Sequence, residues 1–274
     1  MNWKNLFTPV KNITVSQAKA FMDEKKSADY QLLDVRQPRE YERQHLPGAK
    51  LIPLREVPGR LDELEQDKPT IVYCAIGGRS KAAAQLLSGK GFSDVSNMTG
   101  GIKAWNDPTA TGIESEGLEL FKGDEEFADA VSLAYAMEDG LQYFYQTLAQ
   151  SAEDGEVVKL LTRLAGFEEK HKARLRDMAQ KDGEDLHVPG EREDRVMEGG
   201  RLVSEFLERV RPHVKTTRNV FDLAMMLEAQ ALDLYSRMAG KSEEPASRDL
   251  FLQLCDEEKM HLSLLADELD RLLS

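Results

Sequence analysis

A single cysteine lies where a short apolar run meets a helix-forming run, and this position suits a reactive thiol. Thr70–Tyr73 is β-rich and Lys81–Leu87 is rich in alanine, so we expect Cys74 to end a strand and Ser80 to open a helix. Backbone N–H groups, the positive end of the helix dipole and Arg79 would then stabilise a thiolate. The alternative is a buried, inert cysteine at the end of a core strand.

Two glycines make the segment after Cys74 suitable for holding an anion. Gly77 and Gly78 lack a Cβ, so the backbone can curl tightly around a negative charge. The attached Gly-Gly-Arg-Ser favours the reactive interpretation over the buried cysteine. We therefore predict Cys74 and Arg79 as catalytic residues. The predicted substrate-binding loop consists of Ala75, Ile76, Gly77, Gly78 and Ser80.

The second half of the chain contains an internal repeat of glutamates and histidines. In each copy a glutamate is followed 30 residues later by a second one, which begins a Glu-x-x-His sequence. The histidine therefore shares a helical face with the second glutamate. The repeat consists of Glu138, Glu168 and His171 in the first copy and Glu228, Glu258 and His261 in the second.

This residue set is typical of a carboxylate-bridged dinuclear metal site in a four-helix bundle, where two helices give Glu and two give Glu-x-x-His. Carboxylates bridge and neutralise two hard cations, and imidazoles complete the coordination. The alternative is a solvated acidic face. However, Glu138 and Glu228 lie in apolar stripes, where an unpaired carboxylate is costly. Glu169 and Glu257 adjoin the preferred ligands, but the spacing to histidine and the repeat select Glu168 and Glu258.

Strands and helices alternate around the thiol, which predicts a parallel α/β sheet with both faces covered. A Thr14–Gln17 capping box opens a first helix that ends near Lys26. Cys74 then lies beyond the carboxyl end of a strand, where open α/β sheets bind ligands. The other expected elements are strands at 31–35, 51–52, 70–73 and near Val95, and helices at 54–64, interrupted by Pro58-Gly59, and 80–90.

After Asp124 we expect only helices, with no strand. The helices are expected near 124–152, 155–182, 194–210, 217–240 and 245–273, with a long connection containing Gly183, Pro189 and Gly190. The predicted fold is thus an α/β domain at 1–108, a linker at 109–123 and an all-α four-helix bundle at 124–274.

Charge is divided unevenly between these parts. Residues 1–108 hold 16 basic and 13 acidic residues, for a net charge of +3, and the remainder holds 20 and 36, for −16. The acidic half argues against nucleic acid or an anionic membrane as a partner. Two cysteines rule out a disulfide framework and suit a reducing compartment. No apolar run is long enough to span a bilayer, and the first residues lack a signal-peptide core, so we expect a cytoplasmic protein.

The first part resembles single-domain rhodaneses, which carry sulfur as a cysteine persulfide. The resemblance covers about the first 106 residues and rests on Cys-x-x-Gly-x-Arg at Cys74–Arg79. Flanking matches are Leu33–Arg36, Glu40-Tyr41, His45–Ala49, Gly91-Phe92 and Gly100–Trp105. Gln44 departs from the family, which usually has glycine there. The resemblance implies transfer of sulfur from thiosulfate or a persulfide to a thiol or cyanide.

The second part resembles the ferritin-like superfamily, nearest to rubrerythrins and bacterioferritins, over about residues 124–274. Carried over by position, the six repeat residues would be metal ligands. Tyr145 and Tyr235 match tyrosines that hydrogen-bond a ligand carboxylate or donate an electron, although they could equally fill core space. Rubrerythrins carry a further carboxylate one turn after the third-helix glutamate, where this chain has Ala231 and Leu232. They also carry a four-cysteine iron site that two cysteines cannot form.

Together the resemblances imply a sulfurtransferase fused to a di-iron domain that reacts with dioxygen or peroxide. The expected cofactors are two iron ions, with Fe/Fe preferred over Mn/Fe, and no organic cofactor. The expected partners are an external electron donor and, by analogy with ferritin-like bundles, a second copy in a homodimer. The competing interpretation is an iron-storage or iron- and redox-sensing protein in which the rhodanese domain only binds partners.

Overall fold

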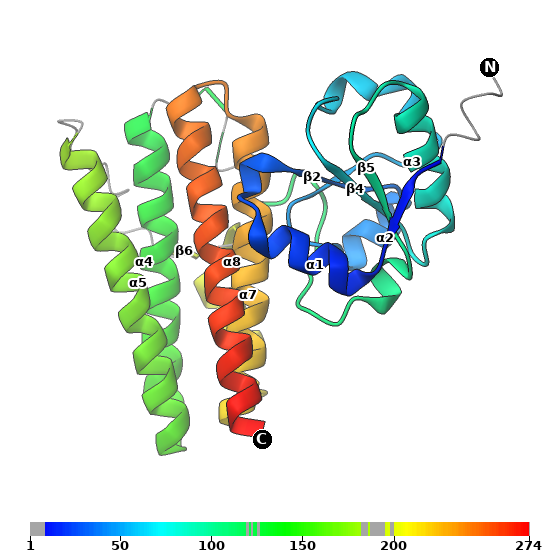
Figure 1. The fold of residues 1–274 in the computed structure, drawn as a ribbon. Helices are drawn as coiled ribbons and strands as arrows, with labels where there is room; N and C mark the ends of the chain where they lie inside the picture. The colour runs from blue at the N-terminus through cyan, green and yellow to red at the C-terminus, as the bar shows by residue number, and fades with distance from the viewer. Residues whose placement is uncertain are drawn as a thin grey trace. The chain divides into compact units, whose positions relative to one another are not determined.

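The computed structural model describes residues 9–118, 121, 123–124, 127–181, 186, 195–197 and 200–273 (Figure 1). The chain divides into two compact units, Met1–Glu114 and Ser115–Ser274. This boundary lies inside the stretch predicted as a linker. Ala110 belongs with the first unit, because its backbone exchanges two hydrogen bonds with His45. Phe121 is buried among helices of the second unit.

The first unit is a parallel sheet flanked by helices, as predicted, and it has five strands. The strand order is β1-β5-β4-β2-β3. The strands are β1 (Lys11–Ile13), β2 (Gln31–Asp34), β3 (Ala49–Leu51), β4 (Thr70–Tyr73) and β5 (Val95–Met98). The helices are α1 (Val15–Glu24), α2 (Pro38–Arg43) and α3 (Gly78–Gly89), with 3-10 turns η2 (Ser27–Asp29), η3 (Val57–Gly59), η4 (Leu61–Glu63) and η5 (Gly101–Ala104).

Both faces of this sheet are apolar because alternate residues of each strand point to opposite sides. Leu32 and Ile71 pack on one side with side chains from α1 and α2. Leu33 and Val72 pack on the other side with the alanines and leucine of α3. The central strand β4 is buried along its whole length, so the residue that follows it, Cys74, is held in a fixed position.

Three local expectations for the first unit need revision. Strand β1 was not expected, because Lys11 and Asn12 give it no apolar pattern. The helix expected at 54–64 is wrong: Pro58 and Gly59 break it into the short turns η3 and η4. Helix α3 begins at Gly78, two residues before Ser80. The Thr14–Gln17 capping box is confirmed at the start of α1.

The second unit is built from two pairs of long helices. Helix α4 packs against α5 and α7 packs against α8, while α4 also contacts α8 and α5 contacts α7. The interior consists of two clusters of apolar side chains, one toward each end of the helices. The helices are α4 (Phe127–Ser151), α5 (Gly155–Lys181), α6 (Val203–Val210), α7 (Thr217–Lys241) and α8 (Pro245–Leu273).

The expectation of helix alone after Asp124 is wrong at one place. Two short strands, β6 (Val196–Met197) and β7 (Arg201–Leu202), pair antiparallel, so the helix expected at 194–210 begins only at Val203. Gly200, directly before β7, has a φ of +75°, which lies in the left-handed region outside the helical range. The connection with Gly183, Pro189 and Gly190 lies outside the described residues.

Among the residues that the structure describes, no helix is both long and apolar enough to cross a membrane.

Gly101 lets η5 pack closely against the backbone of Cys74. It has a φ of +56°, and a Cβ there would lie 2.2 Å from the carbonyl oxygen of Cys74. This close approach lets Ile102 N–H donate to that carbonyl at 2.9 Å. We predict that Gly101→Ala lowers the free energy of unfolding of the first unit by about 2 kcal/mol or more, since strain and a backbone clash add.

Urea unfolding of the whole chain, in which the unfolding of the first unit is monitored, measures this loss of unfolding free energy. Gly59→Ala is the matched control, because nothing lies within 4 Å of its added Cβ. Equal stability of the two variants would contradict the assigned role of Gly101.

Candidate functional sites

The thiol of Cys74 lies at the carboxyl end of β4 and faces the start of α3. Gly77 caps α3 with a φ of +103°, a backbone conformation that favours glycine. Its N–H donates a hydrogen bond to the Cys74 Sγ at 3.1 Å, and the Ser80 hydroxyl lies 3.4 Å from the same sulfur. The structure therefore brings Gly77 and Ser80 of the predicted loop into contact with the predicted nucleophile.

These donors change the acidity of the thiol. Burial alone raises the pKa of Cys74, but the Ser80 hydroxyl and the N–H groups of Ser80, Ile76 and Gly77 outweigh it. The net result is a pKa below the ordinary value of a thiol, as expected for a sulfur facing a helix N-terminus. In contrast, burial raises the pKa of Cys255, which packs in the apolar interior of the bundle.

Arg79 is positioned by a residue to which the sequence assigned no role. Its two terminal nitrogens donate to the two carboxylate oxygens of Glu40, both at 2.7 Å. The hydrogen bond from Arg79 lowers the pKa of Glu40 to about 2, so the pair stays ionised at neutral pH. This fork fixes the guanidinium beside the loop, where its charge acts on Cys74. The two residues are 39 apart, so no local pattern could reveal the pairing.

The repeat residues of the second half converge into two triads, with each ligand atom within 4.8 Å of the others in its triad. Helices α4 and α5 supply one triad, and α7 and α8 supply the other. The glutamates are buried and the histidines are partly exposed. The triads are Glu138, Glu168 and His171, and Glu228, Glu258 and His261.

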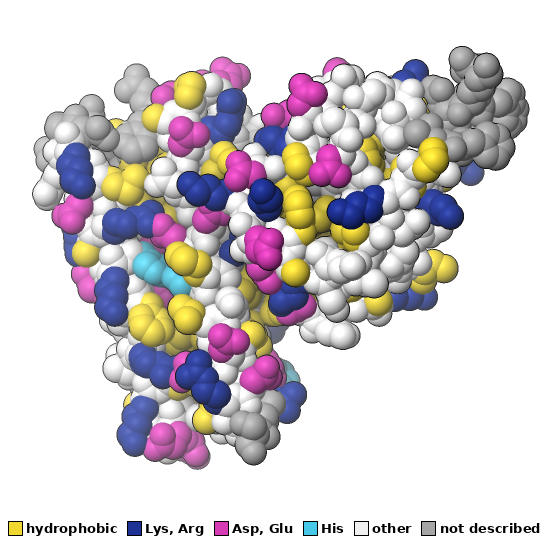
Figure 2. All heavy atoms as spheres, in the orientation of Figure 1, with side chains coloured by type: hydrophobic (Ala, Val, Ile, Leu, Met, Phe, Trp, Pro, Cys, Tyr) yellow, Lys and Arg dark blue, Asp and Glu magenta, His cyan; other side chains and the backbone are white. Residues whose placement is uncertain are grey.

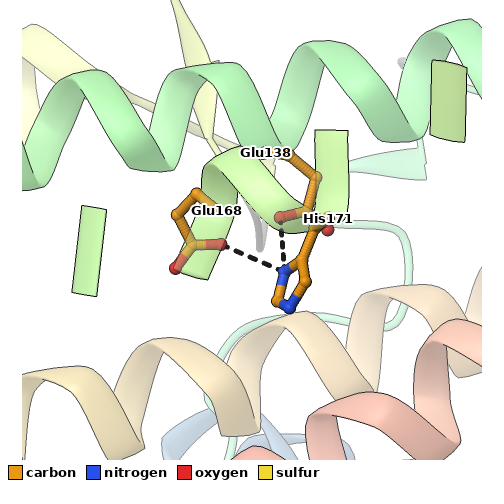
Figure 3. Close-up of side chains that lie close together, drawn as sticks. All are labelled: Glu138, Glu168 and His171. Atoms are coloured by element: carbon orange, nitrogen blue, oxygen red, sulfur yellow. Dashed lines mark hydrogen bonds and ion pairs between the residues drawn. The ribbon is translucent and has the colours of Figure 1, made fainter. Parts of the chain in front are cut away.

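In both triads the histidine Nδ1 faces the two carboxylates. His171 Nδ1 lies 3.1 Å from Glu138 Oε2 and 3.3 Å from Glu168 Oε2 (Figure 3). The second triad repeats this arrangement, with 3.3 Å from His261 to Glu228 and 3.1 Å to Glu258. The internal repeat of the sequence thus appears as two sites of matching geometry.

The two triads adjoin each other. The rings of His171 and His261 stack with centroids 4.6 Å apart and planes 12° from parallel. Each ring is about one-fifth exposed, and Figure 2 shows histidine at the surface of the helical unit with hydrophobic side chains beside it. A pair of ions held by the two triads would therefore be neighbours, as a dinuclear site requires.

These residues fit a pair of metal ions. Glu138 Oε1 is buried and has no hydrogen-bond partner among the described residues, although a buried polar atom normally has one. Burial raises the pKa of Glu138 to about 7, with the charge of Glu168 adding to it. Burial lowers the pKa of His171, yet its hydrogen bonds to Glu138 and Glu168 raise it to about 11. Protons thus occupy a place that cations of matching chemistry could take.

The surroundings of the two triads differ, which the repeat did not reveal. Lys172, beside His171, is buried and donates to Asp139 at 2.9 Å and Gln142 at 2.6 Å. Arg174 forms an ion pair with Glu257 across α5 and α8. The second copy of the repeat has Leu262 and Leu264 at the positions of these two cations. The second copy therefore supplies no cation at these two positions, and the charge of Arg174 acts on Glu138 of the first triad and on Glu258 of the second.

The two tyrosines predicted near the metals are fully buried. Tyr145 belongs to one apolar cluster of the bundle and Tyr235 to the other. Ala231, where rubrerythrins carry a further carboxylate, is buried in an apolar cluster, and Leu232 packs beside it. These two side chains therefore offer a metal ion no oxygen ligand.

Two family models match separate parts of the chain. A rhodanese-like domain matches residues 14–108, and rubrerythrin matches residues 129–269, about half of the chain. The matches account for both units and agree with the positions of the thiol and the triads.

Curated relatives match the first unit. A "Rhodanese-like/PpiC domain-containing protein 12, chloroplastic" from Arabidopsis thaliana is 43% identical over 36% of this chain and 34% of its own length. The "Uncharacterized protein YqhL" of Bacillus subtilis is 44% identical over 27% of this chain and 60% of its own length. The chain thus spans between one-third and three-fifths of these relatives.

Other matches extend over most of a shorter protein. The "Thiosulfate sulfurtransferase GlpE" of Pseudoalteromonas translucida is 34% identical over 35% of this chain and 88% of its own length. A solved rhodanese-like domain protein from Staphylococcus aureus is 32% identical, covers 37% of this chain and 98% of its own, and has a TM-score of 0.35.

We predict that metal uptake by the triads releases protons and weakens as the pH falls below neutrality. The reason is that His171 and Glu138 hold protons in the metal-free protein, and a metal ion must displace them. Anaerobic titration with Fe²⁺ in a weakly buffered solution with a pH indicator measures both effects. Uptake without proton release would contradict the assignment.

The adjacent glutamates supply a matched pair of variants. We expect Glu168→Gln to lose at least one bound ion per chain, whereas Glu169→Gln keeps both, because Glu169 pairs with Arg176 and Lys172 instead. The reverse result would place the ligand one residue later.

Proposed function

Because this chain belongs to the rubrerythrin family and carries a rhodanese-like domain before the rubrerythrin domain, we propose that it is a sulfurtransferase joined to a di-iron oxidoreductase. The observation that carries the first activity is the set of donors around the Cys74 sulfur, the Gly77 N–H and the Ser80 hydroxyl, which favour a lowered thiol pKa. The second rests on the two adjoining triads of buried glutamates and histidine.

In the first activity the Cys74 thiolate attacks the outer sulfur of thiosulfate or of a small persulfide. A new sulfur–sulfur bond forms as the old one breaks, and the electron pair leaves on sulfite or on a thiolate. The product is a Cys74 persulfide. A thiol or cyanide then takes the outer sulfur, which restores the Cys74 thiolate without any net change in the enzyme.

The loop suits the charges of these species. The N–H groups of Ile76, Gly77 and Ser80 meet the negative sulfur, and Arg79, held by Glu40, binds the anionic end of the donor. Relatives named thiosulfate sulfurtransferase support this donor, because they align over 88% and 89% of their lengths at 34% and 35% identity.

In the second activity the six triad residues hold two iron ions, with Fe/Fe preferred over Mn/Fe. The bound ions would supply the redox chemistry toward dioxygen or peroxide, and no organic cofactor is needed. The chain itself neutralises the ions with four carboxylates and surrounds them with the apolar clusters of the bundle. Electrons come from an external donor, because two cysteines cannot form a second iron site of the four-cysteine type.

We predict that the two activities can be removed separately. Cys74→Ser should lose at least about a thousandfold in thiocyanate formation from thiosulfate and cyanide, since a hydroxyl is a far weaker nucleophile at neutral pH. It should keep its iron content and its absorbance change with peroxide in stopped-flow. Glu228→Gln should do the opposite.

Two results would overturn the proposal. Unchanged thiocyanate formation in Cys74→Ser would remove the sulfurtransferase. Uptake of many more than two irons per chain, with no rapid reaction toward peroxide, would favour iron storage.

A further inference from the structure

The hydroxyl of Ser80 lies between the sulfur of Cys74 and the side chain of Asn97 on β5. Ser80 Oγ is 2.7 Å from Asn97 Oδ1 and 3.4 Å from Cys74 Sγ. Ser80 is fully buried, and Asn97 is 1% exposed. Asn97 has no role in the proposed sulfur transfer, yet its side chain is hydrogen-bonded to the Ser80 hydroxyl, which contacts the nucleophile.

A hydroxyl has one hydrogen to give, so it cannot serve both neighbours at once. Asn97 Nδ2 donates to Asn12 Oδ1 at 2.8 Å, and this bond turns the Asn97 oxygen toward Ser80. The shorter of the two Ser80 contacts is the one to that oxygen. While Cys74 is a neutral thiol, the Ser80 hydroxyl therefore donates its hydrogen bond to Asn97 Oδ1, and its oxygen lone pairs face the sulfur.

Ionisation of the thiol reverses this preference. A thiolate is a charged acceptor, and hydrogen bonds to charged groups are stronger than those between neutral groups. The hydroxyl hydrogen then turns to the sulfur, at the cost of the bond to Asn97. In the persulfide the negative charge lies on the outer sulfur, so the hydroxyl next to the inner sulfur can return to Asn97.

We propose that Asn97 is a positioning residue that acts through Ser80. It competes with the Cys74 sulfur for the hydroxyl hydrogen. This competition makes the free thiolate less stable relative to the thiol and the persulfide. This rests on the proposed function only in taking Cys74 as the nucleophile. Arg79 of α3, whose charge acts on Cys74, is paired with Glu40 of α2. Neither contacts Asn97 in this network, so both are unchanged by its substitution.

The test is a pH titration of the thiolate by its ultraviolet absorbance, with Cys74→Ser as the blank. We expect Asn97→Leu to lower the thiol pKa, which increases the acid dissociation constant about threefold to tenfold, the range set by one hydrogen bond. Asn97→Asp keeps the acceptor and the shape but adds charge, so it should raise the pKa.

A double-mutant cycle separates this role from a merely structural one. In a Ser80→Ala background the hydroxyl is gone, and Asn97→Leu should leave the pKa unchanged. An equal shift with and without Ser80 would overturn the proposal, as would a higher pKa in Asn97→Leu or a lower one in Asn97→Asp.

The titration needs no sulfur donor, so it remains informative whatever the enzyme's activity. If the wild-type protein formed no thiocyanate, the proposed sulfurtransferase would fail while the titration still decided the role of Asn97.

Discussion

Four carboxylates held out of water are the constraint on which the helical unit depends. Glu138, Glu168, Glu228 and Glu258 are each at most 5% exposed, and they face one another through two histidines. Unpaired charges in such a place are strongly destabilising, so either protons or cations must share the site. The pKa values of Glu138 and His171 are raised, so protons can take this role when no metal is bound. The long helices position the glutamates, and a pair of bound cations would account for their burial.

The first unit handles negative charge by other means. The sulfur of Cys74 faces backbone N–H groups and the start of α3, and the charge of Arg79 also acts on it; the fold fixes all of these groups. Gly101 allows η5 to press against the backbone of the loop, and Glu40 holds Arg79 in place. Fixed dipoles suit a charge that forms and is lost as a thiol ionises, whereas bound cations would suit carboxylates that are buried permanently.

The sequence was most informative where a function depends on residues close together in the chain or spaced evenly along long helices. The Cys74 loop is seven residues long, and the strand before it and the helix after it differ clearly in composition. The triads were predictable from the repeated spacing of their glutamates and histidines, because spacing along a regular helix determines which side chains share a face. The two units and their order were predictable for the same reason.

Other parts of the sites depend on contacts that leave no local pattern. Glu40 and Arg79 are 39 residues apart, Ser80 and Asn97 are 17 apart, and Arg174 meets Glu257 on another long helix. Strand β1 is three residues long and polar at its start, and the paired strands β6 and β7 lie in a stretch of helical composition, next to Gly200. In these places tertiary packing, rather than propensity, decides the structure.

Anomalous diffraction at the iron edge, from crystals of the protein reconstituted with Fe²⁺ without oxygen, tests the central claim most directly. The account predicts two neighbouring peaks per chain, one contacted by Glu138, Glu168 and His171 and the other by Glu228, Glu258 and His261. A map without these peaks, in which the glutamates turn outward into water, would contradict it.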